Sequence, residues 1–142
     1  MLLVLNVGSS SLKAAVLQAT AARSTELWRT ETQRQGALPD QLGQWLAPQL
    51  NRWWPEIKAA GHRVVHGGES FIAPTRMTVA VLEQLNAVSA LAPLHNPPAL
   101  GAIRWLQQLR PTLPQWVCFD TAFHASLPPE AGLHRRCAVA TF

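Results

Sequence analysis

Residues Leu5 to Lys13 read Leu-Asn-Val-Gly-Ser-Ser-Ser-Leu-Lys, in which an apolar segment runs into a small, hydroxyl-rich turn. Met1–Leu5 is almost purely aliphatic and too short for a buried helix, so it predicts a core strand. Gly8 marks a turn, and the apolar stretch Leu12–Leu17 predicts a second strand. The chain is therefore expected to begin with an antiparallel hairpin of a β-sheet.

The turn has the chemistry of a phosphate site. Glycine permits close backbone approach, the three serines supply hydroxyl donors, and Lys13 adds a charge that suits phosphate oxygens. Asn6, at the end of the first strand, offers a neutral oxygen to a hydrated Mg²⁺ ion. An ordinary hairpin turn has the same composition, and the turn taken alone favours that interpretation. Neither a Gly-x-x-x-x-Gly-Lys-Ser/Thr nor a Gly-x-Gly-x-x-Gly sequence is present, which excludes the familiar phosphate loops.

Further along the chain, the spacing of apolar residues predicts three more strands, at Ser24–Gln33, His62–His66 and Trp116–Phe119. Three strands followed by alternating helices and strands predict an α/β domain with a mixed five-stranded sheet and flanking helices, whose ligands gather at the strand ends. The expected helices are Asp40–Trp54, weakened at Gly43 and Pro48, then Val79–Leu91 behind a Thr78 cap, and a helix from Asn96-Pro97-Pro98 to Leu109.

Polar side chains stand where the predicted strands stop. Asn6 follows the first strand, Arg63 and His66 belong to the fourth, and Asp120 follows the last. Arg63 has the geometry to hold a carboxylate or phosphate with two hydrogen bonds, but a structural ion pair with an acid such as Glu69 is an equal alternative. His66 is expected to make structural hydrogen bonds. These positions predict a polar site at one edge of the sheet.

Two further residues have both a catalytic and a plain interpretation. His95 lies ahead of a helix start that attracts anions, although a lone histidine there is more often a solvated or capping group. Asp120 is suited to orient magnesium or the attacking oxygen in phosphoryl transfer, or simply to cap the next turn.

Composition bounds the class of protein. The 142 residues, 48% of them hydrophobic, predict one domain with a proper core. The net charge is +4, but the arginines are scattered, which argues against a nucleic-acid partner. No apolar run approaches the length of a membrane span, and no export signal is recognisable, so a cytoplasmic location is expected without contact to a membrane.

Four motifs taken together resemble acetate kinase, of the acetokinase family. They are Asn6-Val7-Gly8-Ser9-Ser10-Ser11-Leu12-Lys13, Gly61-His62-Arg63-Val64-Val65-His66-Gly67-Gly68-Glu69, Ala92-Pro93-Leu94-His95-Asn96-Pro97 and Phe119-Asp120-Thr121-Ala122-Phe123-His124. They occur in the family's order and extend from the first strand to about Pro128.

The resemblance implies a ribonuclease-H-like α/β domain of the superfamily that holds acetate and sugar kinases, Hsp70 and actin. It implies reversible phosphoryl transfer from ATP to acetate, giving acetyl phosphate and ADP, with Mg²⁺ as cofactor. The site residues that it implies are Asn6 for magnesium, Ser9, Ser11 and Lys13 for the ATP phosphates, Arg63 for the substrate carboxylate, Val65 and Leu94 for its methyl group, His95 for the transferring phosphoryl group, and Asp120 as the catalytic acid.

The sequence departs from the family pattern in length. Acetate kinases have two domains and more than twice this length, so residues 1–142 are expected to be a single amino-terminal domain without the carboxyl-terminal domain. Negligible turnover is expected from this chain alone, because its ATP loops are missing. The alternatives are a non-catalytic remnant that binds an anion, a partner of a separate carboxyl-terminal chain, or a propionate kinase, since one methylene changes binding by only ~1 to 3 kcal/mol. The family forms homodimers, largely through the missing domain.

Overall fold

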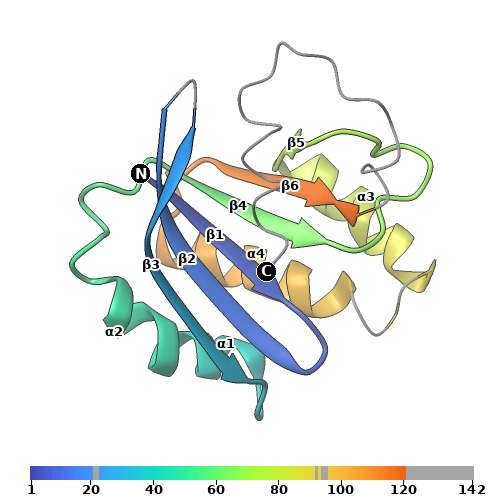
Figure 1. Ribbon diagram of the computed structural model, residues 1–142. Helices are drawn as coiled ribbons and strands as arrows, with labels where there is room; N and C mark the ends of the chain where they lie inside the picture. Colours follow the sequence, from blue (N-terminus) through green and yellow to red (C-terminus); the bar gives the residue numbers. More distant parts are fainter. Residues whose placement is uncertain (21–22, 92, 94–95, 121–142) are drawn as a thin grey trace.

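In the part of the chain that the structure describes, the strands form a six-stranded mixed sheet with the order β3-β2-β1-β4-β6-β5 (Figure 1). The computed structural model describes residues 1–20, 23–91, 93 and 96–120. The α/β prediction is confirmed, but the predicted count of five strands is wrong, because β5 has only two residues and leaves no periodic pattern in the sequence. The strands are β1 (Leu2–Val7), β2 (Ser11–Ala19), β3 (Ser24–Gln33), β4 (Ala59–Val64), β5 (Thr75–Arg76) and β6 (Gln115–Phe119).

The strand directions explain where a site can form. β1, β4 and β6 are parallel neighbours, so their carboxyl ends lie at one edge of the sheet. β2 and β3 extend the sheet in an antiparallel meander beside β1, and β5 pairs antiparallel with β6. Parallel strands end at the same edge, so residues near positions 6, 63 and 120 are brought together.

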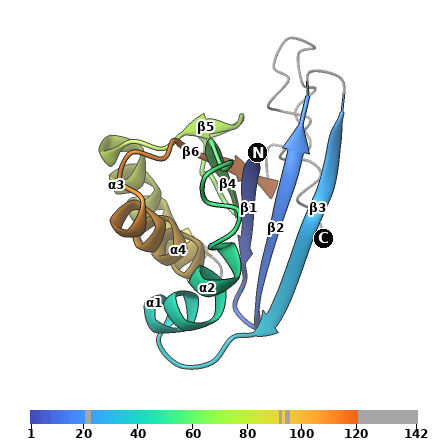
Figure 2. The same cartoon turned by 90° about the vertical axis from the view of Figure 1, so that its left-hand side faces the viewer.

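The helices lie on one side of the sheet (Figure 2). The predicted helix Asp40–Trp54 is found as α1 (Leu38–Gln41), a π-helical stretch (Leu42–Leu46) and α2 (Ala47–Leu50). Pro48 occupies the first turn of α2, where its missing N–H is tolerated. The predicted Thr78 cap is confirmed, because its hydroxyl accepts a hydrogen bond from the Val81 N–H at 3.2 Å. The remaining helices are α3 (Val79–Val88), a 3₁₀ turn (Ser89–Leu91) and α4 (Asn96–Leu109).

Side-chain alternation along the strands separates the core from the site. Leu3 and Leu5 of β1 pack with Leu46 and Leu106 in the core between sheet and helices. Val4 belongs to a separate buried cluster, and successive side chains of a strand point to opposite faces. Asn6 shares the face of Val4, and therefore lies on the face of the sheet opposite the helices.

None of the described helices is long and apolar enough to cross a membrane.

Candidate active site

An open cavity of about 410 Å³ lies at the carboxyl ends of β1 and β4. Its wall combines the serine turn with side chains from four places in the sequence. The lining residues are Asn6, Val7, Gly8, Ser9, Ser10, Ser11, Lys13, Arg63, Val65 and Asp120. Backbone, hydroxyl, cationic, carboxylate and apolar groups thus face one space.

The register of the strands aligns the polar side chains in a row across the sheet. Asn6 of β1 is paired with Lys13 of β2, and Lys13 is paired with Glu31 of β3. On the other side of β1, Leu5 is paired with His62, which places Asn6 beside Arg63 at the next position of β4. Directly paired residues point to the same face. The row therefore reads Glu31, Lys13, Asn6, Arg63 from β3 to β4.

Arg63 is the centre of the hydrogen bonds in the cavity. Its Nε donates to Asp120 Oδ1 at 2.8 Å and its Nη2 to Asp120 Oδ2 at 2.6 Å. Its Nη1 donates to Asn6 Oδ1 at 3.3 Å. Of the two alternatives for Arg63, an ion pair is present, but its carboxylate is Asp120 and not Glu69. A guanidinium has five N–H donors, so two of them remain for a bound anion.

The serine turn is closed by its own backbone. The Gly8 N–H donates to the Ser11 carbonyl at 2.9 Å, which makes a tight connection between β1 and β2. Ser9 and Ser10 are exposed at the tip of this turn. The ordinary hairpin interpretation is thus correct as geometry, and the same turn lines the cavity, so the two interpretations do not exclude each other.

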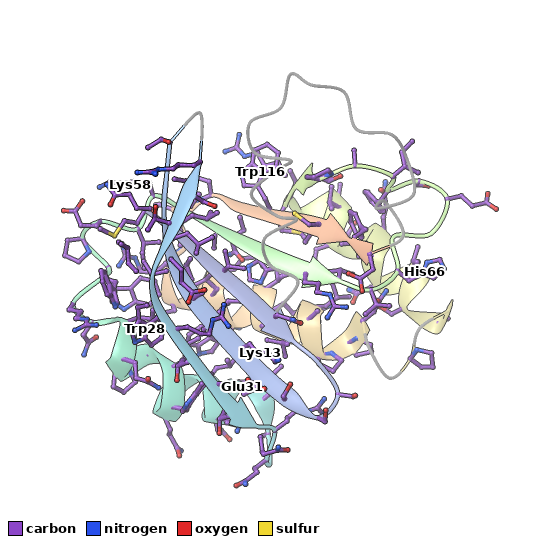
Figure 3. All side chains as sticks on the ribbon, viewed as in Figure 1. Lys13, Trp28, Glu31, Lys58, His66 and Trp116 are labelled. Carbon is purple, nitrogen blue, oxygen red and sulfur yellow. The ribbon has the colours of Figure 1, made fainter. Side chains whose placement is uncertain are left out.

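Lys13 reaches the cavity with a carboxylate beside it. Its Nζ lies 3.3 Å from Glu31 Oε1, and the two side chains are 25% and 53% exposed. Figure 3 shows the two side chains next to each other on neighbouring strands. Glu31 was not predicted as a site residue, because only the pairing of β2 with β3 brings it to Lys13.

Below the cavity, buried polar groups fix the end of β4. His62 is almost fully buried and its Nε2 lies 2.7 Å from Gln115 Oε1 of β6. Burial lowers the pKa of His62 to about 4, against the opposing effect of the Gln115 hydrogen bond. The imidazole is therefore neutral at physiological pH. Although His62 directly precedes Arg63 in the sequence, it adds no second positive charge below the cavity.

The segment after β4 is held by Asn96, the first residue of α4. Asn96 Nδ2 donates to the His66 carbonyl at 2.8 Å, and the His66 N–H donates to Asn96 Oδ1 at 3.2 Å. The Gly68 N–H donates to His66 Nδ1 at 2.8 Å, so the predicted structural role of His66 is confirmed. Gly68 has a φ of 65°, and a Cβ on Gly67 would lie 2.5 Å from the Phe71 carbonyl oxygen, so both positions require glycine.

The residues named from the sequence meet at this cavity. Seven of them line it, while Leu94 and His95 lie outside the described residues. Within the described part of the chain no group of three or more His, Cys, Asp or Glu side chains is arranged to hold a metal ion. Val7 was missed as a lining residue, whereas Gly8 and Ser10 belong to the predicted phosphate-binding turn, in which they had no individual assignment.

Comparison with known proteins assigns the family. The sequence profile of the Acetokinase family matches residues 29–136. The chain belongs to the acetokinase family. It is 37% identical over 167 aligned positions to the acetate kinase of a Synechococcus species, an alignment that covers 94% of this chain and 41% of that protein. It is 54% identical over 76 residues to the acetate kinase of Halothermothrix orenii, covering 54% of this chain and 19% of the relative.

Solved structures of the same family have the same fold. A propionate kinase from Francisella tularensis superposes with a TM-score of 0.74 at 36% identity, covering 89% of this chain and 38% of its own. The acetate kinase of Porphyromonas gingivalis gives a TM-score of 0.70 at 27% identity, over 89% of this chain and 39% of its own. This acetokinase-family chain therefore spans about two fifths of the length of these relatives.

Proposed function

We propose that this chain forms the acceptor half of an acetate kinase site, at which a carboxylate oxygen of acetate attacks the γ-phosphorus of ATP. The bond between that phosphorus and the bridging oxygen of ADP breaks, and acetyl phosphate and ADP are formed; the reaction runs in both directions. The observation that carries the proposal is the cavity in which the serine turn, Lys13, Arg63 and Asp120 face one another. The shared family and the names of the relatives support it.

Arg63 is suited to hold the substrate carboxylate. Its Nε edge is fixed on Asp120, which leaves donors on the terminal nitrogens for a second anion. Val65 lines the same cavity and offers an apolar surface to the methyl group. We assign Leu94 to this surface and His95 to the transferring phosphoryl group on the family resemblance alone. Because Arg63 is anchored before the substrate arrives, little ordering is needed on binding.

The serine turn and Lys13 are assigned to the phosphates. Ser9 and Ser11 present hydroxyl groups, and Lys13 presents an ammonium group, to the cavity that Arg63 also lines. Phosphoryl transfer needs alignment and neutralisation of charge more than covalent help from the protein. Lys13 and Arg63 lie on either side of Asn6, which suits the transfer of a phosphoryl group from a donor held near Lys13 to an acceptor held near Arg63.

The donor set also fits magnesium. Asn6 supplies an amide oxygen and Asp120 a carboxylate to the same cavity, and both are the hard oxygen ligands that Mg²⁺ prefers. Mg²⁺ usually keeps several waters and takes one or two carboxylates plus phosphate oxygens, so a site with few protein ligands suits it. When bound, the ion supplies positive charge to the phosphates. Asp120 in addition holds the Arg63 guanidinium in place.

A non-catalytic anion-binding domain is the second candidate, since Lys13 and Arg63 supply cationic groups to the cavity. Propionate is an alternative acceptor, as the Francisella neighbour is named a propionate kinase. We further propose a cytoplasmic location, where ATP, the proposed phosphoryl donor, is available.

Turnover and binding separate these candidates. Acetyl hydroxamate formation from ATP, Mg²⁺ and acetate or propionate should be negligible for the 142-residue chain alone. Its recovery on mixing with the carboxyl-terminal domain of an acetate kinase, and its loss again in Asp120→Ala, would support the kinase. Calorimetric binding of acetyl phosphate that is lost in Arg63→Ala, with no turnover in the mixture, would support the anion-binding domain. Absence of both from a folded chain would contradict the proposed site.

A further inference from the structure

We propose that Glu31 is a positioning residue of this site, which holds the Lys13 ammonium group and lowers the affinity of the empty site for phosphate. The inference rests on the proposed function, since it assumes that Lys13 meets a phosphate. It adds a residue from outside the turn that contains Lys13. Glu31 lies on β3, 18 residues further along the chain, and reaches the site only through the pairing of β2 with β3.

The geometry of the pair is that of an exchangeable contact. Lys13 Nζ and Glu31 Oε1 are 3.3 Å apart, and the carboxylate side chain is 53% exposed. An exposed ion pair between two long side chains is stabilised only weakly, because water competes for both charges. A phosphate with more than one negative charge can therefore displace the single carboxylate from the ammonium group.

The two cationic side chains of the cavity have similar neighbours. Arg63 has Asn6 on one side and the Asp120 carboxylate on the other, and Lys13 has Asn6 on one side and Glu31 on the other. Each cation thus carries a carboxylate on the side away from β1. The difference is strength, since the Arg63 pair has two hydrogen bonds of 2.8 and 2.6 Å and the Lys13 pair one longer contact.

Because the Arg63 and Lys13 ion pairs differ in strength, we expect them to respond differently to an incoming phosphate. Asp120 stays on Arg63 and keeps the guanidinium in one orientation. Glu31 keeps Lys13 extended along the row when no anion is present, and gives it up when a phosphate arrives. Removing the Glu31 charge should remove both the competition for Lys13 and the repulsion of the incoming phosphate.

The matched control lies on the same strand. Glu26 is also a glutamate of β3, and its Oε2 lies 2.7 Å from Arg29 Nη2. It is paired with Leu17 of β2, which lies four residues beyond Lys13, so Glu26 is on the same face of the sheet as Glu31. Glu26→Gln removes the same charge from the same strand but away from the cavity. Glu31→Gln retains the shape of the side chain, and thermal unfolding of all variants checks that they are folded.

The experiment measures the dissociation constant of inorganic tripolyphosphate by calorimetry, at low salt and at high salt. We expect Glu31→Gln to bind about two- to fivefold more tightly than the unmodified chain at low salt, the range of one exposed ion pair. The gain should shrink at high salt because exposed charges are screened. Lys13→Ala should bind more weakly, and Lys13→Ala combined with Glu31→Gln should lack most of the gain.

The outcomes distinguish this inference from the proposed function. If Glu31→Gln binds no more tightly than the unmodified chain or Glu26→Gln while Lys13→Ala still loses affinity, the role of Glu31 is overturned and the phosphate site stands. If Lys13→Ala binds as the unmodified chain does, or if neither binds, Lys13 is not in a phosphate site and both inferences are overturned.

Discussion

Arg63 holds both carboxylate oxygens of Asp120, with Nε 2.8 Å from Oδ1 and Nη2 2.6 Å from Oδ2. The two residues are 57 positions apart in the sequence and are joined because β4 and β6 are parallel neighbours. Only a planar guanidinium can satisfy both oxygens at once in this way. The pair connects the residue assigned to the substrate with the residue assigned to catalysis.

Arg63→Lys should therefore not be a conservative change. The lysine keeps the charge but loses the fork, so it cannot hold Asp120 and a substrate carboxylate together. A hydrogen bond to a charged group contributes about 1.5 to 3 kcal/mol, which predicts a loss of about 10- to 150-fold in acetyl phosphate affinity. Calorimetric titration measures it. Arg76 lies on the exposed edge strand β5, so Arg76→Lys is the matched control and should bind acetyl phosphate as the unmodified chain does. If Arg63→Lys binds acetyl phosphate as tightly as the unmodified chain, the assigned role of Arg63 is contradicted.

The ion pair itself should contribute little to stability. The side chains of Arg63 and Asp120 are 34% and 33% exposed, so water screens the attraction. A double-mutant cycle of Arg63→Ala and Asp120→Ala should give a coupling free energy of about 1 kcal/mol. Urea denaturation of the four chains measures it. A coupling of several kcal/mol would mean that the pair serves the fold first and the site second.

The sequence could predict which residues meet, but not how they pair. The aliphatic run of β1 and the turn at Gly8 are local signals, and the motifs around Arg63 and Asp120 carry the family resemblance. Glu31 has no local signal, because its approach to Lys13 depends on the register of β3, which shifts between Val16 and Leu17 of β2. A shift of one residue would turn Glu31 to the other face.

Two other misses have similar causes. β5 is a strand only because Thr75 and Arg76 pair with β6, and two residues cannot show a period. The choice between Glu69 and Asp120 as partner of Arg63 required the relative position of β4 and β6. Contacts across strands are tertiary information, which composition and spacing within one strand do not contain.

Acid should destabilise the fold through His62. Its pKa in the folded chain is about 4, below the ordinary 6.5, because burial disfavours the charged form. The stabilisation from keeping this histidine neutral is therefore fully present above pH 6.5 and is lost as the pH falls from 6.5 toward 4. This lowering of the pKa corresponds to about 3 kcal/mol in the free energy of unfolding. The free energy of unfolding, measured in urea at several pH values in this range, should fall less steeply in His62→Gln, which has no titrating group but can still pair with Gln115. Identical slopes in both chains would show that other groups cause the acid sensitivity.

Asn96→Ala should uncouple the end of β4 from α4. Asn96 is fully buried and gives both ends of its side-chain amide to the His66 backbone. Its loss leaves the partly buried N–H and carbonyl of His66 without these partners, and a polar group that loses its partner away from water costs about 1 to 3 kcal/mol. We expect the free energy of unfolding to fall by about 2 to 4 kcal/mol. The amide hydrogen of His66 should also exchange faster with solvent under native conditions.

Asn86→Ala is the control, because Asn86 accepts a hydrogen bond from Arg104 at an exposed position and should change stability little. Faster exchange confined to the segment after β4, with anion binding weakened in parallel, would tie Asn96 to the position of Arg63 and Val65; unchanged exchange at His66 would refute the clamp.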